Sequence, residues 1–542
     1  MRRNASVPNQ KYLVNSAGPP RFDGAHRKRR LQRCLSSEYS QHSLVEAPRR
    51  RRGWLAEIDN VFLVRNTSFV VLILAFAVIA ASCAINPATG KRQLSLISNE
   101  REVQIGRESD REIQQSLGVY DDVELQAYIQ AFGTKLAADS ERPDLDWTFR
   151  VVDDATVNAF ALPGGFIYIT RGIMAHLNSE AELAAVVGHE IGHVTARHSV
   201  NQMSKAQLAG VGLSVATVIS TDYRQLSDLA QTGVGLLFLK YSRDDERQAD
   251  DLGLRYTLRA DYDPRPTPDI YRMLNRVSEA QGATAIPALV ATHPDPLNRA
   301  IRMEEAIAGL DQDLSGSSLG QERYYEKLDG MVFGEDPREG FFDGDTFLHP
   351  DLQFMLAFPS GWSMTNGRAA VVGLSPGQDA MIKVTMATEA TPDQALRAFL
   401  AGDGVGAGAP WSGRINGLPT AGREFRAYSQ QGNRQGAVAF VEFDNAVYRL
   451  IGITSEEQWE NYALTIKQSL SSFNRLTDPS ALQVEPRRLR IVRVGSAVDL
   501  PTFARKFDAS VPVDTLALIN HIDAGAMLEP GRAYKTVTGG NQ

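Results

Sequence analysis

The sequence predicts an α+β fold that is divided among several domains. Apolar residues recur at helical spacing through much of residues 99–310, and short alternating strands follow from residue 347. Residues 489–537 then have the order strand, helix, helix, strand. A chain of 542 residues is also too long to form a single hydrophobic core.

The first domain is expected to begin with two helices, over residues 103–117 and 123–138, followed by a strand over 147–152. Residues 166–170 are β-branched and aromatic, and Pro163-Gly164-Gly165 precedes them, which predicts two short strands around a turn. An exposed edge of this hairpin could bind an extended peptide through main-chain hydrogen bonds. An ordinary hairpin beside the core explains the pattern equally well.

The segment His189-Glu190-Ile191-Gly192-His193 has the spacing of a zinc site. Residues four apart share one face of a helix, so both imidazoles can bind one ion, and Glu190 would take a proton from the water that the ion activates. Ser179 and Glu182 form a capping-box pattern before the apolar run 183–187, which predicts that the motif is helical. The two glycines beside the histidines, at 188 and 192, suggest that another backbone approaches this helix closely.

A catalytic zinc needs a third protein ligand and an open position. Ser199 stands where a metzincin would have its third histidine, and His198 is one residue short, so that class is disfavoured. Glu246 and Asp250 stand four apart on a second expected helix, where one carboxylate can ligate zinc while the other orients a ligand histidine. His293, in a proline-rich loop, could donate to the oxyanion or occupy the open position and hold the site latent.

Four motifs in the order NAFALPGGFIYIT, HEIGH, SRDDERQAD and THPDPLNR resemble the HtpX and CAAX-prenyl-endopeptidase family of zinc gluzincins, whose soluble periplasmic lipoprotein members are most similar. The resemblance covers Asn86 to Leu310. It implies a mainly helical, zincin-like metallopeptidase domain over residues 86–311, with a small substrate-binding sheet. The implied activity is zinc-dependent cleavage of misfolded or misassembled proteins of the bacterial cell envelope.

The resemblance also implies a role for each site residue. One Zn²⁺ would be bound by His189, His193 and Glu246, with Glu190 as the general base and His293 as a catalytic residue in one of its two open roles. Asp250 would hold a ligand histidine from behind. The strand that pairs with the substrate backbone would contain Asn158, Ala159 and Phe160. The rival interpretation is a latent relative that acts mainly as a chaperone-like outer-membrane assembly factor.

The N-terminal region differs in composition from the rest. Residues 1–65 contain two arginine-rich runs among polar residues, which predicts a disordered basic tail, an arm attracted to acidic lipid or nucleic acid, or a stretch upstream of the true translation start. The apolar run Phe69 to Ala81 suits a signal peptide over residues 66–83, and Ala80-Ala81-Ser82-Cys83 resembles a lipoprotein cleavage site. The hypothesis is that Cys83 becomes the lipidated N-terminus. Because alanine follows it, attachment to the outer membrane, facing the periplasm, is favoured.

Charge and cysteine content narrow the classes further. The net charge of −7 argues against a nucleic-acid partner for the folded part. The chain has two cysteines, and Cys34 lies in the part expected to be lost, so no disulfide is expected in the mature protein.

Two further domains are expected after a polar linker at 311–323. Residues 325–475, with helices near 392–400 and 456–473, resemble a Mog1/PsbP-type α/β sandwich on the motif FPSGW, and no catalytic spacing occurs there. Residues 487–540 resemble a LysM module, which would either bind peptidoglycan or be purely structural. The uncharged segment 206–220 is interpreted as a buried helix first and a mobile flap second.

Overall fold

The computed structural model describes residues 83–208, 240–281, 293–428 and 432–540, which all belong to one compact unit. The expected basic tail and signal segment, and most of the uncharged segment 206–220, lie outside the described residues. Among the described helices, none combines the length and the apolar character that crossing a bilayer would require.

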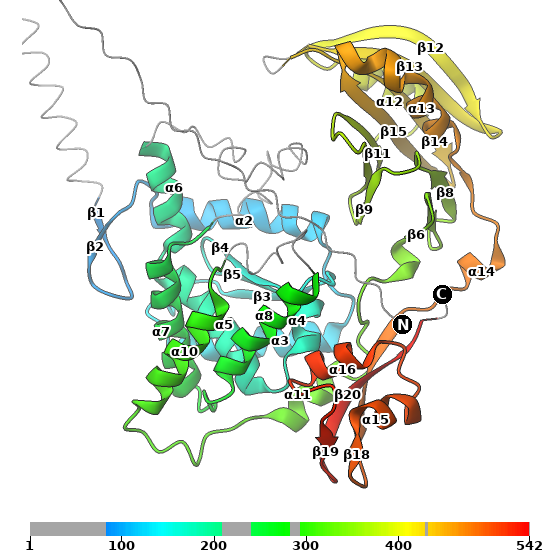
Figure 1. Ribbon diagram of the computed structural model, residues 1–542. Helices are drawn as coiled ribbons and strands as arrows, with labels where there is room; N and C mark the ends of the chain where they lie inside the picture. Colours follow the sequence, from blue (N-terminus) through cyan, green and yellow to red (C-terminus); the bar gives the residue numbers. More distant parts are fainter. Residues whose placement is uncertain (1–82, 209–239, 282–292, 429–431, 541–542) are drawn as a thin grey trace, which may run out of the picture. The chain divides into compact units, whose positions relative to one another are not determined.

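The part of the chain before residue 329 is mainly helical and surrounds a small sheet (Figure 1). Its helices are α2 (Asn99–Ser116), α3 (Val123–Ala138), α4 (Arg171–His176), α5 (Glu180–Thr195), α6 (His198–Leu208), α7 (Arg243–Arg259), α8 (Thr267–Gln281), α10 (Pro296–Ala308) and α11 (Gln321–Leu328). Its strands are β1 (Cys83–Ile85), β2 (Arg92–Leu94), β3 (Thr148–Val152), β4 (Ala159–Leu162) and β5 (Phe166–Thr170). The predicted helix over 123–138 and the predicted strand over 166–170 are confirmed to the residue.

The sheet of this region has the order β3-β5-β4, with β3 parallel and β4 antiparallel to β5. The predicted hairpin is therefore present, and β4 is an edge strand among the described residues. Thr170 at the end of β5 caps α4, because its side chain accepts a hydrogen bond from the backbone of Ile173. The chain thus leaves the sheet directly into the helices that carry the histidine motif.

Helices α5 and α7 pack backbone against backbone. A Cβ atom added at Gly188 would lie 3.1 Å from the Gly253 carbonyl oxygen, and one at Gly192 would lie 3.0 Å from the Ala249 carbonyl oxygen. Real Cβ atoms rarely come this close to other atoms, so side chains here would push the helices apart. The close approach expected from the two glycines of the motif is confirmed, and it brings the acidic start of α7 against the histidines.

The capping box predicted for α5 forms only in part. The Ser179 side chain accepts from the backbone N–H of Glu182, as expected for an N-cap. The Glu182 carboxylate accepts from the backbone of Asn178 instead of Ser179, at 2.7 Å. The Glu182 carboxylate therefore caps the backbone one residue before the N-cap, and this side chain is buried.

The middle region combines two antiparallel sheets with two principal helices. A seven-stranded sheet has the order β12-β13-β14-β15-β11-β10-β9, and a four-stranded sheet has the order β16-β8-β7-β6. The strands are β6 (Phe341–Asp343), β7 (Thr346–His349), β8 (Phe354–Ala357), β9 (Ser363–Gly367), β10 (Ala370–Leu374), β11 (Ala380–Met386), β12 (Val405–Ile415), β13 (Leu418–Ala427), β14 (Arg434–Phe443), β15 (Ala446–Ser455) and β16 (Asn474–Arg475). The helices are the 3₁₀ turns η4 (Pro337–Glu339) and η5 (Glu456–Gln458), α12 (Pro392–Leu400), α13 (Trp459–Ser471) and α14 (Pro479–Leu482).

Alternation along β14 explains how two helices cover this larger sheet. Ala437 and Ala439 belong to the core beneath α13, whereas Val438 and Phe440 belong to the core beneath α12. The two helices therefore cover opposite faces, and the helix predicted over 392–400 is confirmed.

The C-terminal module, residues 487–540, has the predicted order of elements. Its strands are β17 (Arg487–Arg493), β18 (Val498–Asp499), β19 (Met527–Leu528) and β20 (Ala533–Gly539), and its helices are α15 (Leu500–Lys506) and α16 (Val513–Ile519). Its apolar side chains join the same continuous core as the helices of the N-terminal region. The linker expected at residues 311–323 is shorter than predicted, because helix α11 begins at Gln321. This helix buries Tyr324 completely in the same core.

Candidate metal centre

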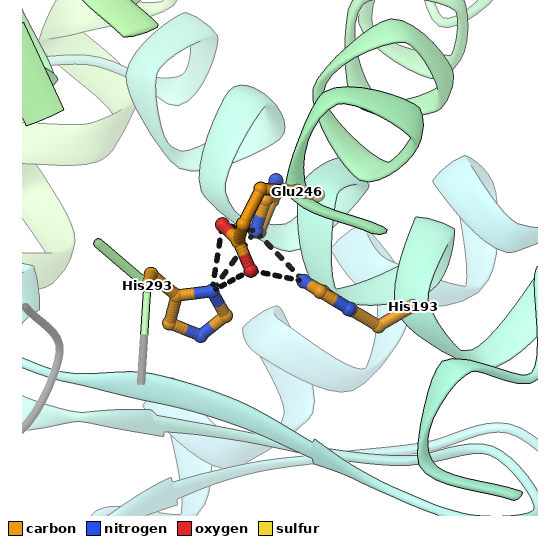
Figure 2. Close-up of side chains that lie close together, drawn as sticks. His193, Glu246 and His293 are labelled. Atoms are coloured by element: carbon orange, nitrogen blue, oxygen red, sulfur yellow. Dashed lines mark hydrogen bonds and ion pairs between the residues drawn. The ribbon is translucent and has the colours of Figure 1, made fainter. Parts of the chain in front are cut away.

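Three segments bring the ionisable side chains of the site together. Helix α5 supplies His189 and His193, the first turn of α7 supplies Glu246, and the loop before α10 supplies His293. All four side chains are buried, and each offers an atom that lies within 4.8 Å of the others. Figure 2 shows the rings of His193 and His293 directed at the Glu246 carboxylate.

The distances between these atoms fit one metal ion. The Nε2 atoms of His189 and His193 are 3.0 Å apart, and each lies 3.6 Å from a Glu246 carboxylate oxygen. Bonds of about 2.0–2.1 Å to a tetrahedral ion place its ligand atoms about 3.3–3.4 Å apart. The chemistry also fits, since two imidazoles and a carboxylate are a donor set that divalent zinc accepts.

His293 approaches the same point. Its Nδ1 atom lies 2.9 Å from Glu246 Oε1 and 3.4 Å from His189 Nε2. Its Nε2 atom lies 3.9 Å from a carboxylate oxygen of Glu190. The ring is thus within reach of both the ion position and the expected base, which the two interpretations of its role require.

Both motif histidines are held from behind through Nδ1, which leaves Nε2 directed at the cluster. His189 Nδ1 lies 3.0 Å from Asp250 Oδ1, and His193 Nδ1 lies 3.0 Å from His198 Nδ1. His198 is in turn fixed by Gln248 at 3.0 Å through its other nitrogen. Such outer partners orient ligand histidines and raise their basicity. His198, which stands one residue short of the position of a metzincin's third histidine, therefore contacts a ligand histidine from behind.

Arg299 on α10 is a site residue that the sequence analysis missed. Its guanidinium is buried and lies 2.6 Å from Asp250 Oδ1 and 3.1 Å from Glu246 Oε2. It also lies over the ring of Tyr271, 4.5 Å from the ring centre. The motif THPDPLNR ends in this arginine. Its position one turn into a helix that begins beside His293 was the only local hint that it could reach the site.

Burial and these neighbours set the charges of the site. Burial by itself would raise the pKa of Glu246, but His293 and Arg299 outweigh it and lower the pKa to about 2. The same competition, decided by Arg299 and His189, holds the pKa of Asp250 well below its usual range. Burial raises the pKa of Glu190 against the opposing effect of His293 and His189, as a proton acceptor that works near neutrality requires. Burial also lowers the pKa of His193, which keeps the imidazole neutral and able to ligate.

The expected substrate strand lies where the hairpin was predicted, with one shift. Ala159 and Phe160 are in β4, whereas Asn158 directly precedes it. The Asn158 carbonyl accepts from the Thr170 N–H at 3.1 Å, so Asn158 faces β5. Residue pairs along an antiparallel ladder alternate between hydrogen-bonded and non-hydrogen-bonded. The main-chain groups of Phe160, which pairs with Tyr168, therefore also face β5. The main-chain groups that face away from β5 therefore belong to Ala159 and Ala161. All four residues of β4 are buried, so the edge is less exposed than the sequence led us to expect.

The part of the chain that contains the site is similar to known peptidases. Residues 124–307 match Peptidase family M48. The matched segment contains the two motif histidines, Glu246 and His293, and a divalent metal is what this family implies.

Two curated relatives share this part of the chain. The Beta-barrel assembly-enhancing protease of Escherichia coli (strain K12) is 26% identical over 242 residues, which are 42% of this chain and 49% of that protein. The Mitochondrial metalloendopeptidase OMA1 of Arabidopsis thaliana is 34% identical over 172 residues, or 31% of this chain and 33% of that protein. The chain thus spans about half or less of the length of these relatives.

The similarities to solved structures are weak. The PsbP protein of Synechocystis sp. PCC 6803 is similar over 24% of this chain and 91% of its own, with 13% sequence identity and a TM-score of 0.21. A score this low supports no assignment, so the PsbP-like and LysM-like interpretations stay predictions.

Proposed function

We propose that this protein is a zinc-dependent endopeptidase of the bacterial cell envelope. The observation that carries the proposal is the convergence of His189, His193 and Glu246 at the spacing of one tetrahedral ion. The match of residues 124–307 to Peptidase family M48 and the similarity to two named proteases support it. A bound divalent ion would polarise the scissile carbonyl and acidify a water molecule.

The side chains of the site have distinct tasks in this proposal. Glu190 accepts the proton of the attacking water and passes it to the leaving amine, which its buried position and raised pKa favour. Asp250 and His198 hold the two motif histidines in the orientation that presents Nε2. Arg299 offsets the negative charge of Glu246 and Asp250, so that the buried carboxylates stay ionised.

The edge strand β4 would hold the substrate in an extended conformation. Its main-chain groups at Ala159 and Ala161 face away from β5 and would pair with a peptide that reaches this buried edge. This mode of binding reads the backbone and leaves the sequence of the substrate open, which suits the cleavage of misassembled envelope proteins of many kinds.

The substitution Glu190→Gln tests the catalytic proposal. It keeps the shape of the side chain and removes the base, so casein cleavage should fall by about 10²–10⁴-fold. Metal content by mass spectrometry should stay at one ion per chain. The matched control is Glu124→Gln, which makes the same change on an exposed turn of α3 and should leave cleavage unchanged. Equal activity of Glu190→Gln and wild type would end the proposal.

A second candidate function, a latent assembly factor, is favoured by His293. Because Nδ1 of this residue lies within ligand distance of the same point, it can fill the position that a substrate needs. His293→Ala should then raise casein cleavage, whereas a role in stabilising the oxyanion would make the same variant slower. If the protein acts mainly as an assembly factor, Glu190→Gln will restore growth to a strain that lacks the gene.

Two sequence features, Cys83 and the C-terminal module, support a location in the cell envelope in this proposal. Cys83 starts strand β1, the first described element, and is the last residue of the predicted signal segment. We propose that lipidation of Cys83 anchors the protein to the outer membrane on the periplasmic side, and that residues 487–540 contact peptidoglycan if they bind any glycan. Mass spectrometry of the mature protein should find a diacylated N-terminal Cys83. A mature chain beginning at another residue would contradict the anchor.

A further inference from the structure

The side chain of Tyr241 lies against one face of a motif histidine, and the tasks assigned so far do not use it. Its ring centre is 4.0 Å from that of His193, and the two ring planes are inclined by 28°, so the rings are stacked. Aromatic pairs in proteins usually have their centres about 4.5–7 Å apart. The contact is therefore close, and it leaves the imidazole little room to tilt toward Tyr241.

Both ends of Tyr241 are fixed. Its hydroxyl group shares a hydrogen bond of 2.9 Å with Ser199 Oγ on α6. Its backbone leads into α7 through a capping box, in which Ser242 Oγ accepts from the Asp245 N–H at 3.2 Å and an Asp245 carboxylate oxygen accepts from the Ser242 N–H at 3.0 Å. The residue after this box is Glu246, so one capped turn fixes both the tyrosine and the carboxylate of the metal centre.

Edge contacts and the face contact restrain the imidazole of His193 in different directions. His198 Nδ1 lies 3.0 Å from His193 Nδ1, and the His189 ring stands nearly perpendicular, with the ring centres 4.6 Å apart. A contact at the edge resists rotation of the ring within its own plane, whereas the Tyr241 ring resists tilting out of that plane. Both restraints are needed to keep His193 Nε2 directed at the point that it shares with Glu246 Oε1, which is 3.6 Å away.

We propose that Tyr241 is a positioning residue, which holds the His193 ring in the plane in which Nε2 meets the metal ion. This inference rests on the metal site of the proposed peptidase. The lone pair of an imidazole nitrogen lies in the plane of the ring, so a tilted ring would direct it past the ion. Partners that orient a ligand histidine in this way strengthen metal binding. A leucine could occupy similar space but has no flat face, whereas a phenylalanine has the face and lacks only the hydroxyl group.

The zinc affinity of two variants tests the need for a flat ring. The metal-free full chain is titrated with Zn²⁺ in competition with a chelator of known affinity. Tyr241→Leu should weaken zinc binding by about 10–100-fold, the usual effect of removing a partner that orients a metal ligand. Tyr241→Phe keeps the stacked ring and should bind zinc as tightly as the wild type. Equal zinc affinities of Tyr241→Leu and Tyr241→Phe would overturn the positioning role.

A spectroscopic signature separates positioning from support of the fold. Cobalt(II) in place of zinc absorbs visible light, with band positions and intensities that depend on the geometry of its ligands. At saturating cobalt, Tyr241→Leu should change these bands, and Tyr241→Phe should keep the wild-type spectrum. The matched control is Tyr448→Leu, the same change at a buried ring of the middle region, 5.1 Å from the ring of Phe354. It should lower the urea midpoint without altering the cobalt spectrum or the zinc affinity. A wild-type spectrum in Tyr241→Leu would show that the tyrosine only supports the fold.

The positioning role and the peptidase proposal fail in distinguishable ways. If the wild type binds zinc and cleaves casein while Tyr241→Leu matches it in affinity and spectrum, the positioning role is wrong and the peptidase stands. If the wild type binds zinc but cleaves nothing, while Tyr241→Leu loses affinity and Tyr241→Phe keeps it, the positioning role stands and the peptidase proposal is overturned. A wild type that binds no metal would overturn both.

Discussion

Helix α5 carries a buried polar cluster at each end, and the two clusters are satisfied in opposite ways. At its C-terminal half, His189 and His193 point nitrogen atoms at each other from 3.0 Å, with Glu246 and His293 directed at the same place. At its first turn, Glu182 lies near Lys535 of β20. The Lys535 ammonium is fully buried and donates to the carbonyls of Ala175 and Leu177, both at 2.8 Å.

The difference separates a set of potential metal ligands from a structural contact. In the first cluster two imidazole nitrogens and a carboxylate converge, which is a donor set that a divalent cation accepts. In the second, donors meet acceptors and a cation lies near a carboxylate, so the protein itself completes the cluster. Burial raises the pKa of Glu182 and lowers that of Lys535, so desolvation acts on both partners of the second cluster.

The largest effect is expected from removing one acceptor of the first cluster. His193→Ala should lose the stoichiometric metal and at least about 10³-fold in peptidase activity, because a metal supplies several kcal/mol of transition-state stabilisation. Metal content and casein cleavage measure this. His198→Gln, which alters only the partner behind His193, should weaken metal binding by about 10–100-fold. Full metal content in purified His193→Ala would make the first cluster a structural one.

Breaking the second cluster should affect folding and leave metal stoichiometry unchanged. Lys535→Met leaves two buried carbonyls without their donor and should lower the free energy of unfolding by about 3 kcal/mol. Adding Glu182→Gln should recover part of this loss, because the uncompensated carboxylate is removed. Urea denaturation compares the variants, with exposed Lys506→Met as the control in the same module. A Lys535→Met protein as stable as the control would mean that the module is not integral to the core.

The effect that is smallest at neutral pH is the titration of two histidines at the second cluster, where His521 Nδ1 lies 3.6 Å from Glu182 Oε1 and His176 is a neighbour of His521. Burial lowers the pKa of His176 to about 4 and that of His521 to about 3. Below pH 6.5 the unfolded chain therefore binds protons that the folded chain refuses, so stability falls as the pH falls, by about 1.4 kcal/mol per pH unit for each histidine. His521→Asn, which tolerates the left-handed backbone at this position (φ 54°), should reduce the slope between pH 6.5 and 4. Urea midpoints across this range measure it, and identical slopes would refute the assignment.

Much of the site could be predicted from local patterns. The spacing of His189 and His193 and the glycines beside them define one face of a helix, and they predicted both the ligand pair and the close approach of a second helix. Glu246 and Asp250 were recognisable because their spacing of four residues also places them on one face of a helix. Arg299 could not be assigned, because an arginine in an amphipathic helix usually faces water. Only the packing of α10 against α7 brings it to Asp250 and Glu246.

The sequence by itself determined the order of helices and strands and the residues that can ligate a metal, because helical and strand periodicity are local properties of the chain. The tertiary structure alone decided which polar groups meet across long separations. It placed His293 against Glu246, turned the main-chain groups of Ala159 and Ala161 away from β5, and brought Lys535 of the last strand to the start of α5. These contacts join residues tens to hundreds of positions apart, and they form only when one continuous core excludes water around them.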